Sequence, residues 1–250
     1  MSKNMLNNLV LTFFLSTSFF GFLLIGVLSF KSPIFQEGFS WQEEIIGVVY
    51  GLICLFGIFA ALSPNSCSQI VNLRRKEKPA HRGDLEQNKV ISQTFDVRGH
   101  HHMCGNFSSH VFHVRGRIFC ASCNGLLIGG LLSLAGTVLF FFFNWHIGSD
   151  PLLFAFGVLG VALNMISILL FDLWIKHLVR AFLNIFFVLG TFLILVAANE
   201  HAQNFGLNLL VIAFSVFWLL TRILLSQWRH ERICSACGIE NCWFRHSGAS

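Results

Sequence analysis

The sequence predicts an all-α polytopic membrane protein: six transmembrane helices with a small metal-knuckle and β-hairpin insert and a Cys/His-rich tail. Of its 250 residues, 54% are hydrophobic and only 12% are charged, whereas soluble globular domains have about 45–50% and about 25%. The apolar residues form long blocks rich in Phe and Leu, without a heptad or Gly-x-y period. This composition excludes a soluble domain, a disordered chain, collagen and a coiled coil.

Six segments are apolar and long enough to cross a hydrocarbon core about 30 Å thick, which takes about 20 helical residues. They cover residues 9–30, 45–62, 125–145, 152–175, 181–198 and 205–225. The first segment follows Lys3, as the core of a secretory signal would. It is longer than such a core, and no small-residue cleavage site follows it, so we expect it to remain as a transmembrane helix.

The segments divide the chain into four parts. Residues 1–62 contain the first two transmembrane helices, and residues 63–124 form a basic insert rich in Cys and His. Residues 125–225 contain four further helices joined by short links, and residues 226–250 form a tail rich in Cys and His. Within the insert, two β-rich runs on either side of Gly116 predict a hairpin over residues 110–120.

The placement of Lys and Arg predicts the orientation, because cytoplasmic flanks carry the positive excess. With both termini in the cytoplasm, all 17 of these residues except Lys31 belong to the cytoplasmic side. The outer side then holds the acidic residues Glu37, Glu43, Glu44, Asp150 and Glu200. We therefore expect a multi-pass protein of the plasma membrane with cytoplasmic N and C termini.

A basic cluster follows the second segment and consists of Arg74, Arg75, Lys76 and Lys78. Such a cluster can rest on anionic lipid headgroups, although a solvated topology signal is the simpler interpretation. The partners expected from the sequence are the lipid bilayer and a protein in the membrane or at its cytoplasmic face. No feature indicates specific binding of nucleic acid.

Two arrays of Cys and His lie in the insert and the tail, on the side where thiols are normally reduced. The insert has the spacing His101-x2-Cys104-x15-Cys120-x2-Cys123, which is that of a zinc ribbon with His in place of the first Cys. The tail has the spacing Cys234-x2-Cys237-x4-Cys242-x3-His246. Because two close pairs of donors can fill a tetrahedral shell, the arrays predict one or two zinc ions, with iron as the alternative.

The pairing of these ligands stays open. Each array could hold its own ion, or the two Cys-x-x-Cys pairs could share one site that ties the insert to the tail, leaving His101, Cys104, Cys242 and His246 for another. His102 is a substitute for His101, whereas His110 and His113 are expected at the hairpin surface or behind the ligands. Gly125, two residues after the first pair, can supply a positive φ for a metal knuckle.

Polar residues inside the segments are further candidates. Asp172 lies near the inner end of the fourth segment, and an intramembrane carboxylate is a candidate functional group. Arg180 and Arg222 belong to the same layer, so a structural ion pair is the simpler interpretation of Asp172. The side chains of Asn164, Asn184 and Asn208 are expected to donate interhelical hydrogen bonds. Cys54, alone in a segment, is expected to be a small core residue.

The run Phe119-Cys120-Ala121-Ser122-Cys123-Asn124-Gly125 leads straight into an apolar segment. With Cys104 upstream, it resembles an uncharacterised family of small prokaryotic membrane proteins that carry Cys-x-x-Cys-x-Gly at the mouth of a transmembrane helix. The resemblance covers about residues 104–130. It implies a prokaryotic membrane protein with a metal-binding knuckle.

Three functions are compatible with these features. The favoured one is a membrane scaffold or accessory subunit whose cytoplasmic cap is organised by structural zinc, because four protein donors leave no open position on the ion. The alternatives are a membrane-bound thiol-redox or metal-handling enzyme that uses Cys120 and Cys123, and a transporter that uses Asp172. No motif of a hydrolase triad, a zinc protease helix or a phosphate-binding loop is present in the sequence.

Overall fold

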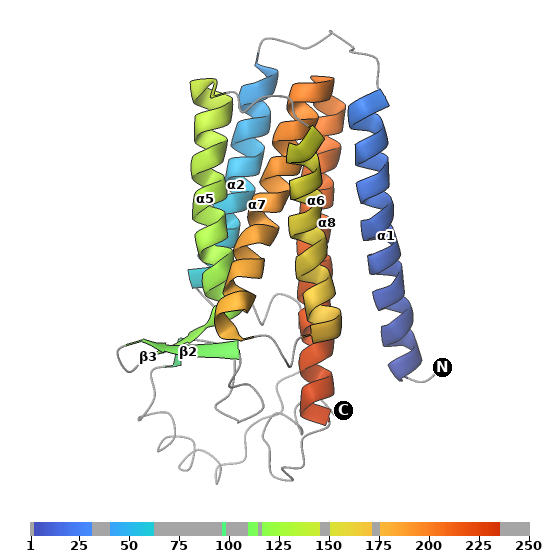
Figure 1. Cartoon of the computed structure of the whole chain (residues 1–250), viewed down its shortest axis with the longest axis vertical. Coiled ribbons are helices and arrows are strands. Elements are labelled where there is room, and N and C mark those ends of the chain that lie inside the picture. The colour runs from blue at the N-terminus through green and yellow to red at the C-terminus, as the bar shows by residue number, and fades with distance from the viewer. Residues whose placement is uncertain are drawn as a thin grey trace, which may run out of the picture.

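The computed structural model describes residues 3–31, 41–62, 97–98, 110–114, 117–145, 151–171 and 176–235 (Figure 1). These residues are almost all helical. The helices are α1 (Lys3–Lys31), α2 (Gln42–Leu62), α5 (Ala121–Phe143), α6 (Pro151–Ile166), α7 (His177–Ala202) and α8 (Phe205–Ser235). A π-helical turn, η2 (Ser167–Phe171), continues α6. Three short strands are β1 (Val97–Arg98), β2 (Val111–Val114) and β3 (Arg117–Cys120).

Within the described residues, six helical stretches are long and apolar enough to cross a membrane, as the sequence predicted: Asn8–Phe30, Gln42–Leu62, Ala121–Phe143, Pro151–Leu170, His177–Ala202 and Phe205–His230. Several boundaries differ from expectation, and two of them involve helices that carry predicted Cys ligands. α5 begins directly after β3, so that Cys123 lies in its first turn rather than in a preceding loop. α8 continues ten residues past the expected end at Leu225, because neither Gly nor Pro interrupts the chain before Ser235.

The helices run alternately up and down, so the bundle has two ends (Figure 1). The strand end carries β2 and β3, the beginnings of α5 and α7, and the end of α8. The far end carries the beginnings of α2 and α8 and the end of α7.

α7 is the central helix of the bundle. It packs against α5, α6, α8 and α1, and it has the largest buried share of the six apolar stretches. Glycines allow its closest approaches: a Cβ on Gly190 would lie 2.6 Å from the Gly157 carbonyl oxygen of α6. Small residues at such crossings let two membrane helices bring their backbones together. The contact therefore fixes α6 against α7.

Gly125 has a different role from the one expected. It lies inside α5, with helical backbone, and provides no left-handed turn for a knuckle. A Cβ at this position would collide with the Ala181 carbonyl oxygen and would lie 2.8 Å from the Asn184 Cβ. Glycine is thus needed because the beginning of α5 touches the backbone of α7.

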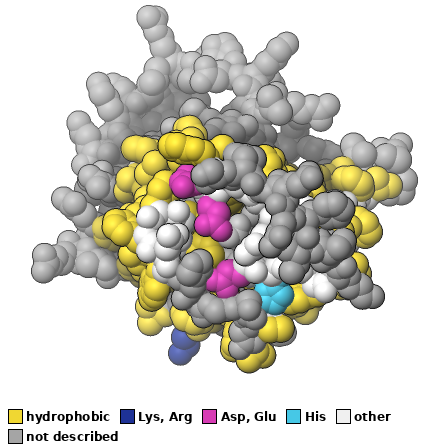
Figure 2. Space-filling model, turned by 90° about the horizontal axis from the view of Figure 1, so that it is seen from above, with side chains coloured by type: hydrophobic (Ala, Val, Ile, Leu, Met, Phe, Trp, Pro, Cys, Tyr) yellow, Lys and Arg dark blue, Asp and Glu magenta, His cyan; other side chains and the backbone are white. Residues whose placement is uncertain are grey.

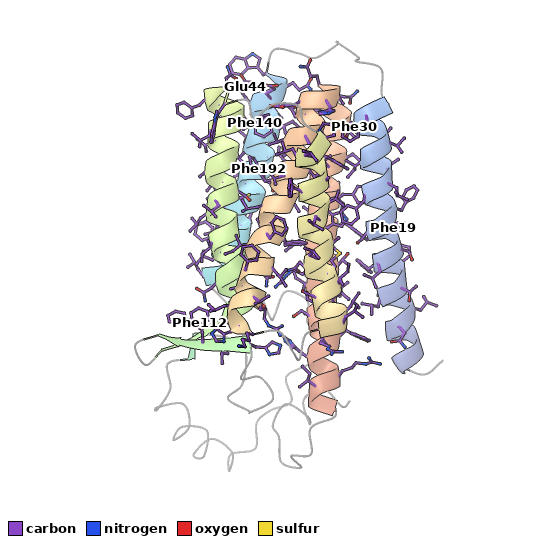
Figure 3. All side chains as sticks on the ribbon, in the orientation of Figure 1. Phe19, Phe30, Glu44, Phe112, Phe140 and Phe192 are labelled. Carbon is purple, nitrogen blue, oxygen red and sulfur yellow. The ribbon has the colours of Figure 1, made fainter. Side chains whose placement is uncertain are left out.

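α1 packs mainly on α8 and has the smallest buried share of the six stretches. The Trp218 indole N–H donates to the Ser18 carbonyl oxygen at 3.3 Å, and the Ser18 and Thr221 hydroxyl oxygens are also 3.3 Å apart. Phe19 lies on the outside of α1, 64% exposed (Figure 3). Exposed apolar side chains of this kind recur on α2, α5 and α6 and indicate contact with the lipid bilayer.

The three strands form one small sheet in the order β1-β3-β2. β3 pairs parallel with β1 and antiparallel with β2, in a register that places Val111 opposite Cys120 and Val114 opposite Arg117. Phe112 and Phe119 stack across the antiparallel pair, with ring centroids 5.8 Å apart. β2 and β3 fall on the two β-rich runs of the sequence, while the turn that would join them lies outside the described residues.

Candidate functional site

The first Cys-x-x-Cys pair lies where the sheet meets α5. Cys120 is the last residue of β3 and the N-cap of α5, and it is 2% exposed. Cys123 is half-buried in the first turn of the helix. The Asn124 side-chain amide donates to the Cys120 carbonyl oxygen at 3.0 Å. A strand on one side and a helix on the other thus fix the position of both thiols.

His110 meets the end of α8. It directly precedes β2 and is 1% exposed, and its ring centroid lies 5.7 Å from that of His230. Of the two expectations for His110, a place at the hairpin surface is excluded by this burial, and a place behind the metal ligands stays a prediction. Its neighbour Val111 pairs with Cys120, so the same register that positions the thiol also brings the imidazole to α8.

One of the other predicted ligands, Cys234, lies near the end of α8. α8 extends through Cys234, which follows His230 by one helical turn. The positions outside the described residues are His101, Cys104, Cys237, Cys242 and His246. Among the side chains that the structure does describe, no three of His, Cys, Asp and Glu lie close enough to hold one metal ion. The zinc shells therefore stay a prediction.

A buried polar layer lies beside the thiols, between α5, α6, α7 and α8. Arg222 of α8 donates its Nε hydrogen to the Asn184 amide oxygen of α7 at 2.7 Å. Asn184 in turn donates to the Arg180 carbonyl oxygen at 2.7 Å. Both guanidinium groups are buried, with Arg180 8% and Arg222 6% exposed. The layer holds two cationic side chains within stretches that are long enough to cross a membrane.

The asparagines behave in part as the sequence predicted. Asn184 forms an interhelical bond, although it accepts rather than donates it, and Asn208 donates to the Asn199 amide oxygen at 2.6 Å. Asn164 is 1% exposed, and its amide oxygen has no hydrogen-bond partner among the described residues. Asp172 lies outside the described residues, so its ion pair with the arginines stays a prediction.

The far end has its own polar network, which the sequence did not reveal. The Asn199 amide donates to the Glu43 carboxylate at 3.1 Å, and Asn199 accepts from Asn208. The Gln42 amide donates to the Gln203 carbonyl oxygen at 3.3 Å. Figure 2 looks onto this end and shows acidic side chains close together on its face. Asn199 was missed because it stands one residue beyond the expected end of its segment.

Charge is sorted between the two ends. The Lys and Arg residues whose side chains are described all belong to the strand end: Lys176, Arg180, Arg222, Arg229 and Arg232. The acidic residues whose side chains are described all belong to the far end: Glu43, Glu44 and Glu200. A membrane protein with this asymmetry presents one basic and one acidic face to the two sides of the bilayer.

No protein-family model, curated protein or solved structure matches the chain. The resemblance of residues 104–130 to the prokaryotic knuckle family therefore stays a prediction. Function has to follow from the thiols, imidazoles and buried polar groups of this chain alone.

Proposed function

We propose that the protein is an integral membrane scaffold or accessory subunit whose strand end is organised by one or two structural zinc ions. The contact between His110 and His230 is the observation that carries this proposal. It joins the insert to the end of α8, although the two residues are 120 positions apart in the sequence. A cap in which insert and tail meet is what a shared metal site requires.

The contact favours one of the two ligand pairings. Cys120 pairs with Val111, the residue after His110, in the register of β2 and β3, and Cys234 follows His230 by one helical turn. The two Cys-x-x-Cys pairs therefore begin next to the contact. In the proposed arrangement Cys120, Cys123, Cys234 and Cys237 hold one ion, while the remaining donors, His101, Cys104, Cys242 and His246, hold a second.

The proposed ions stabilise the cap and do not catalyse a reaction. Strands of two to four residues cannot bury a core of their own, so coordination has to substitute for apolar burial. Four protein donors fill a tetrahedral zinc and leave no position for water or substrate. Cys120 is also 2% exposed, which disfavours thiol–disulfide exchange with an external partner because such exchange needs access to the sulfur.

We further propose that the strand end faces the cytoplasm. The described cations all belong to this end, and the described carboxylates belong to the other, as the positive-inside rule requires. The proposal places the thiols in a reducing compartment, where metal binding is favoured over disulfides. A basic, metal-organised cap at this face would be the docking surface for a partner protein.

Metal analysis of the purified chain tests the proposal. We expect one or two zinc ions per chain and less zinc in Cys120→Ser and Cys123→Ser, which should also be cleaved faster by protease within the insert. Cys54→Ser is the matched control, because Cys54 is buried in the core of α2 away from the cap. A metal-free wild type, or equal zinc loss in Cys54→Ser, would contradict the proposal.

A further inference from the structure

A chain of three hydrogen-bonded polar side chains links α2, α7 and α8 at the far end. The Asn208 amide donates to the Asn199 amide oxygen at 2.6 Å, and the Asn199 amide donates to the Glu43 carboxylate at 3.1 Å. Asn208 is 0% exposed and Asn199 is 3% exposed. The carboxylate is thus joined to two amides that the bundle encloses.

The carboxylate fixes the direction of both amides. An ionised carboxylate only accepts hydrogen bonds, so Asn199 has to present its NH2 group to Glu43. The Asn199 oxygen then faces Asn208, which has to present its own NH2 group in turn. The Asn208 oxygen is left over, and it has no hydrogen-bond partner among the described residues. A buried amide oxygen without a donor is costly, which favours the binding of a ligand there.

An amide oxygen can bind a hydrogen-bond donor or a cation, and the charge of the far end favours a cation. Segments 29–47, 140–154 and 196–210 contain the helix termini of this end and the links between them. In the sequence they hold five acidic residues, one Lys and two His. Two negative charges would remain even if the Lys and both His were protonated. Figure 2 shows acidic side chains close together on this face.

Glu44, which follows Glu43 in the first turn of α2, adds a second oxygen of this kind. Its side chain lies at the far end of the bundle (Figure 3). Its carboxylate oxygen Oε2 is buried and has no hydrogen-bond partner among the described residues. Enclosing a charged oxygen without a donor or a cation costs more than enclosing a neutral one. Two enclosed oxygens at the same end thus favour a positively charged ligand.

The number of charged groups indicates an ion of single charge. Among the described side chains, no three of His, Cys, Asp and Glu lie close enough to hold one metal ion. A divalent ion such as Ca²⁺ is usually held by several carboxylates. One carboxylate is enough to balance a monovalent ion, and uncharged oxygens within membrane proteins commonly coordinate sodium.

We propose that the far end binds one sodium ion, with the Asn208 amide oxygen as its buried ligand and the Glu43 carboxylate as its counter-charge. Asn199 holds both groups in place, because it is hydrogen-bonded to each of them. The bound ion would join α8 to α2 and would neutralise part of the acidic end. Sodium would thereby stabilise the packing of α2, α7 and α8.

Thermal unfolding of the full chain in a neutral detergent tests this site. Sodium chloride would replace choline chloride stepwise, so that ionic strength and chloride concentration do not change. We expect a saturable rise of Tm with sodium. Asn208→Leu should weaken the sodium affinity about tenfold or more, because the buried ligand is lost. Ser215→Ala is the matched control and should keep the affinity, because Ser215 lies two turns further along α8 and donates to the Val211 carbonyl oxygen of its own helix.

A second variant keeps the test decisive even if Asn208→Leu does not fold. Glu43→Gln retains an oxygen for Asn199 but removes the charge, so it should also weaken the sodium affinity about tenfold. In choline chloride alone both variants should lose little stability, because only their hydrogen bonds change. A wild type insensitive to sodium, or an unchanged affinity in both variants, would overturn the proposal. A larger rise of Tm with calcium than with sodium at equal concentration would also overturn it, because the ion would then be divalent.

Discussion

The two ends of the bundle are built by the same helices but bury opposite kinds of polar group. At the strand end, Asn184 of α7 accepts a hydrogen bond from the Arg222 guanidinium. At the far end, Asn199 of the same helix donates to the Glu43 carboxylate. The side-chain amide of Asn can accept a hydrogen bond from a cation or donate one to an anion. The charge at each end of the bundle is therefore set by the side chain that bonds to the Asn. The difference shows how a nearly all-apolar bundle distinguishes its two sides.

The largest expected effect concerns which end faces the cell interior. Trp41 is exposed at the far end, and Lys176 is exposed at the strand end. The variants Trp41→Cys and Lys176→Cys therefore each place an accessible thiol at one end. An impermeant maleimide applied to intact cells should label the first strongly and the second only after lysis. Labelling of the Cys at position 176 in intact cells would show that the strand end lies outside the cell. The thiols of this end would then not be in a reducing compartment, and disulfides would no longer be disfavoured.

Helix packing at the strand end gives the next largest effect. Gly125→Ala should destabilise the protein by about 3 kcal/mol, because the new methyl group meets the Ala181 carbonyl of α7. Gly51→Ala is the matched control: its Cβ would lie 3.6 Å from the Leu134 Cδ1, an ordinary contact. It should be neutral or stabilising by less than about 1 kcal/mol. Denaturant titration in mixed micelles measures both.

Removing the Asn184 amide at the strand end should cost less stability than the Gly125→Ala substitution. Asn184→Leu leaves the buried Arg222 Nε without its acceptor, and we expect a loss of about 2 kcal/mol. Asn184→Asp keeps an oxygen in place and should retain most of the stability. Equal losses in both variants would show that the hydrogen bond to Arg222 contributes little.

The corresponding far-end substitution should have the smallest effect. Asn208→Leu removes a neutral donor to Asn199 and also removes a buried oxygen that has no partner among the described residues. We expect a loss of about 1 kcal/mol in the same titration. Glu43→Gln keeps an acceptor for Asn199 and should change little. A larger loss in Asn208→Leu than in Asn184→Leu would reverse the ranking of the two ends.

The sequence predicted the helices well because membrane insertion depends on a sum over about 20 residues. The apolar runs therefore identified all six stretches, and the boundary errors arose where polar residues continue a helix, as in α8 beyond Leu225. The candidate layer with Arg180, Asn184 and Arg222 could also be anticipated. Each is a polar residue inside an apolar run and must find a partner.

Contacts between distant segments were not predictable, because helices that are apolar all round do not reveal which face is buried. The contacts missed in this way include Asn199 with Asn208, and the Tyr50 and Thr191 hydroxyl oxygens, which are 2.8 Å apart. The role of Gly125 was misread for the same reason. A glycine that is needed for close approach cannot be told from a glycine that is needed for a turn without the neighbouring helix. The contact of His110 with His230 was missed because the sequence does not show how the insert packs against the end of α8.

Zinc-edge X-ray absorption of the purified chain tests the central claim most directly. Shared structural sites of the proposed kind predict a closed tetrahedral shell dominated by sulfur, with zinc–sulfur distances of about 2.3 Å and some nitrogen from His. Cys120→Ser should reduce the sulfur contribution, whereas Cys54→Ser should leave the spectrum unchanged. Absence of zinc, or an oxygen donor from water in the wild-type shell, would contradict a structural metal at the strand end.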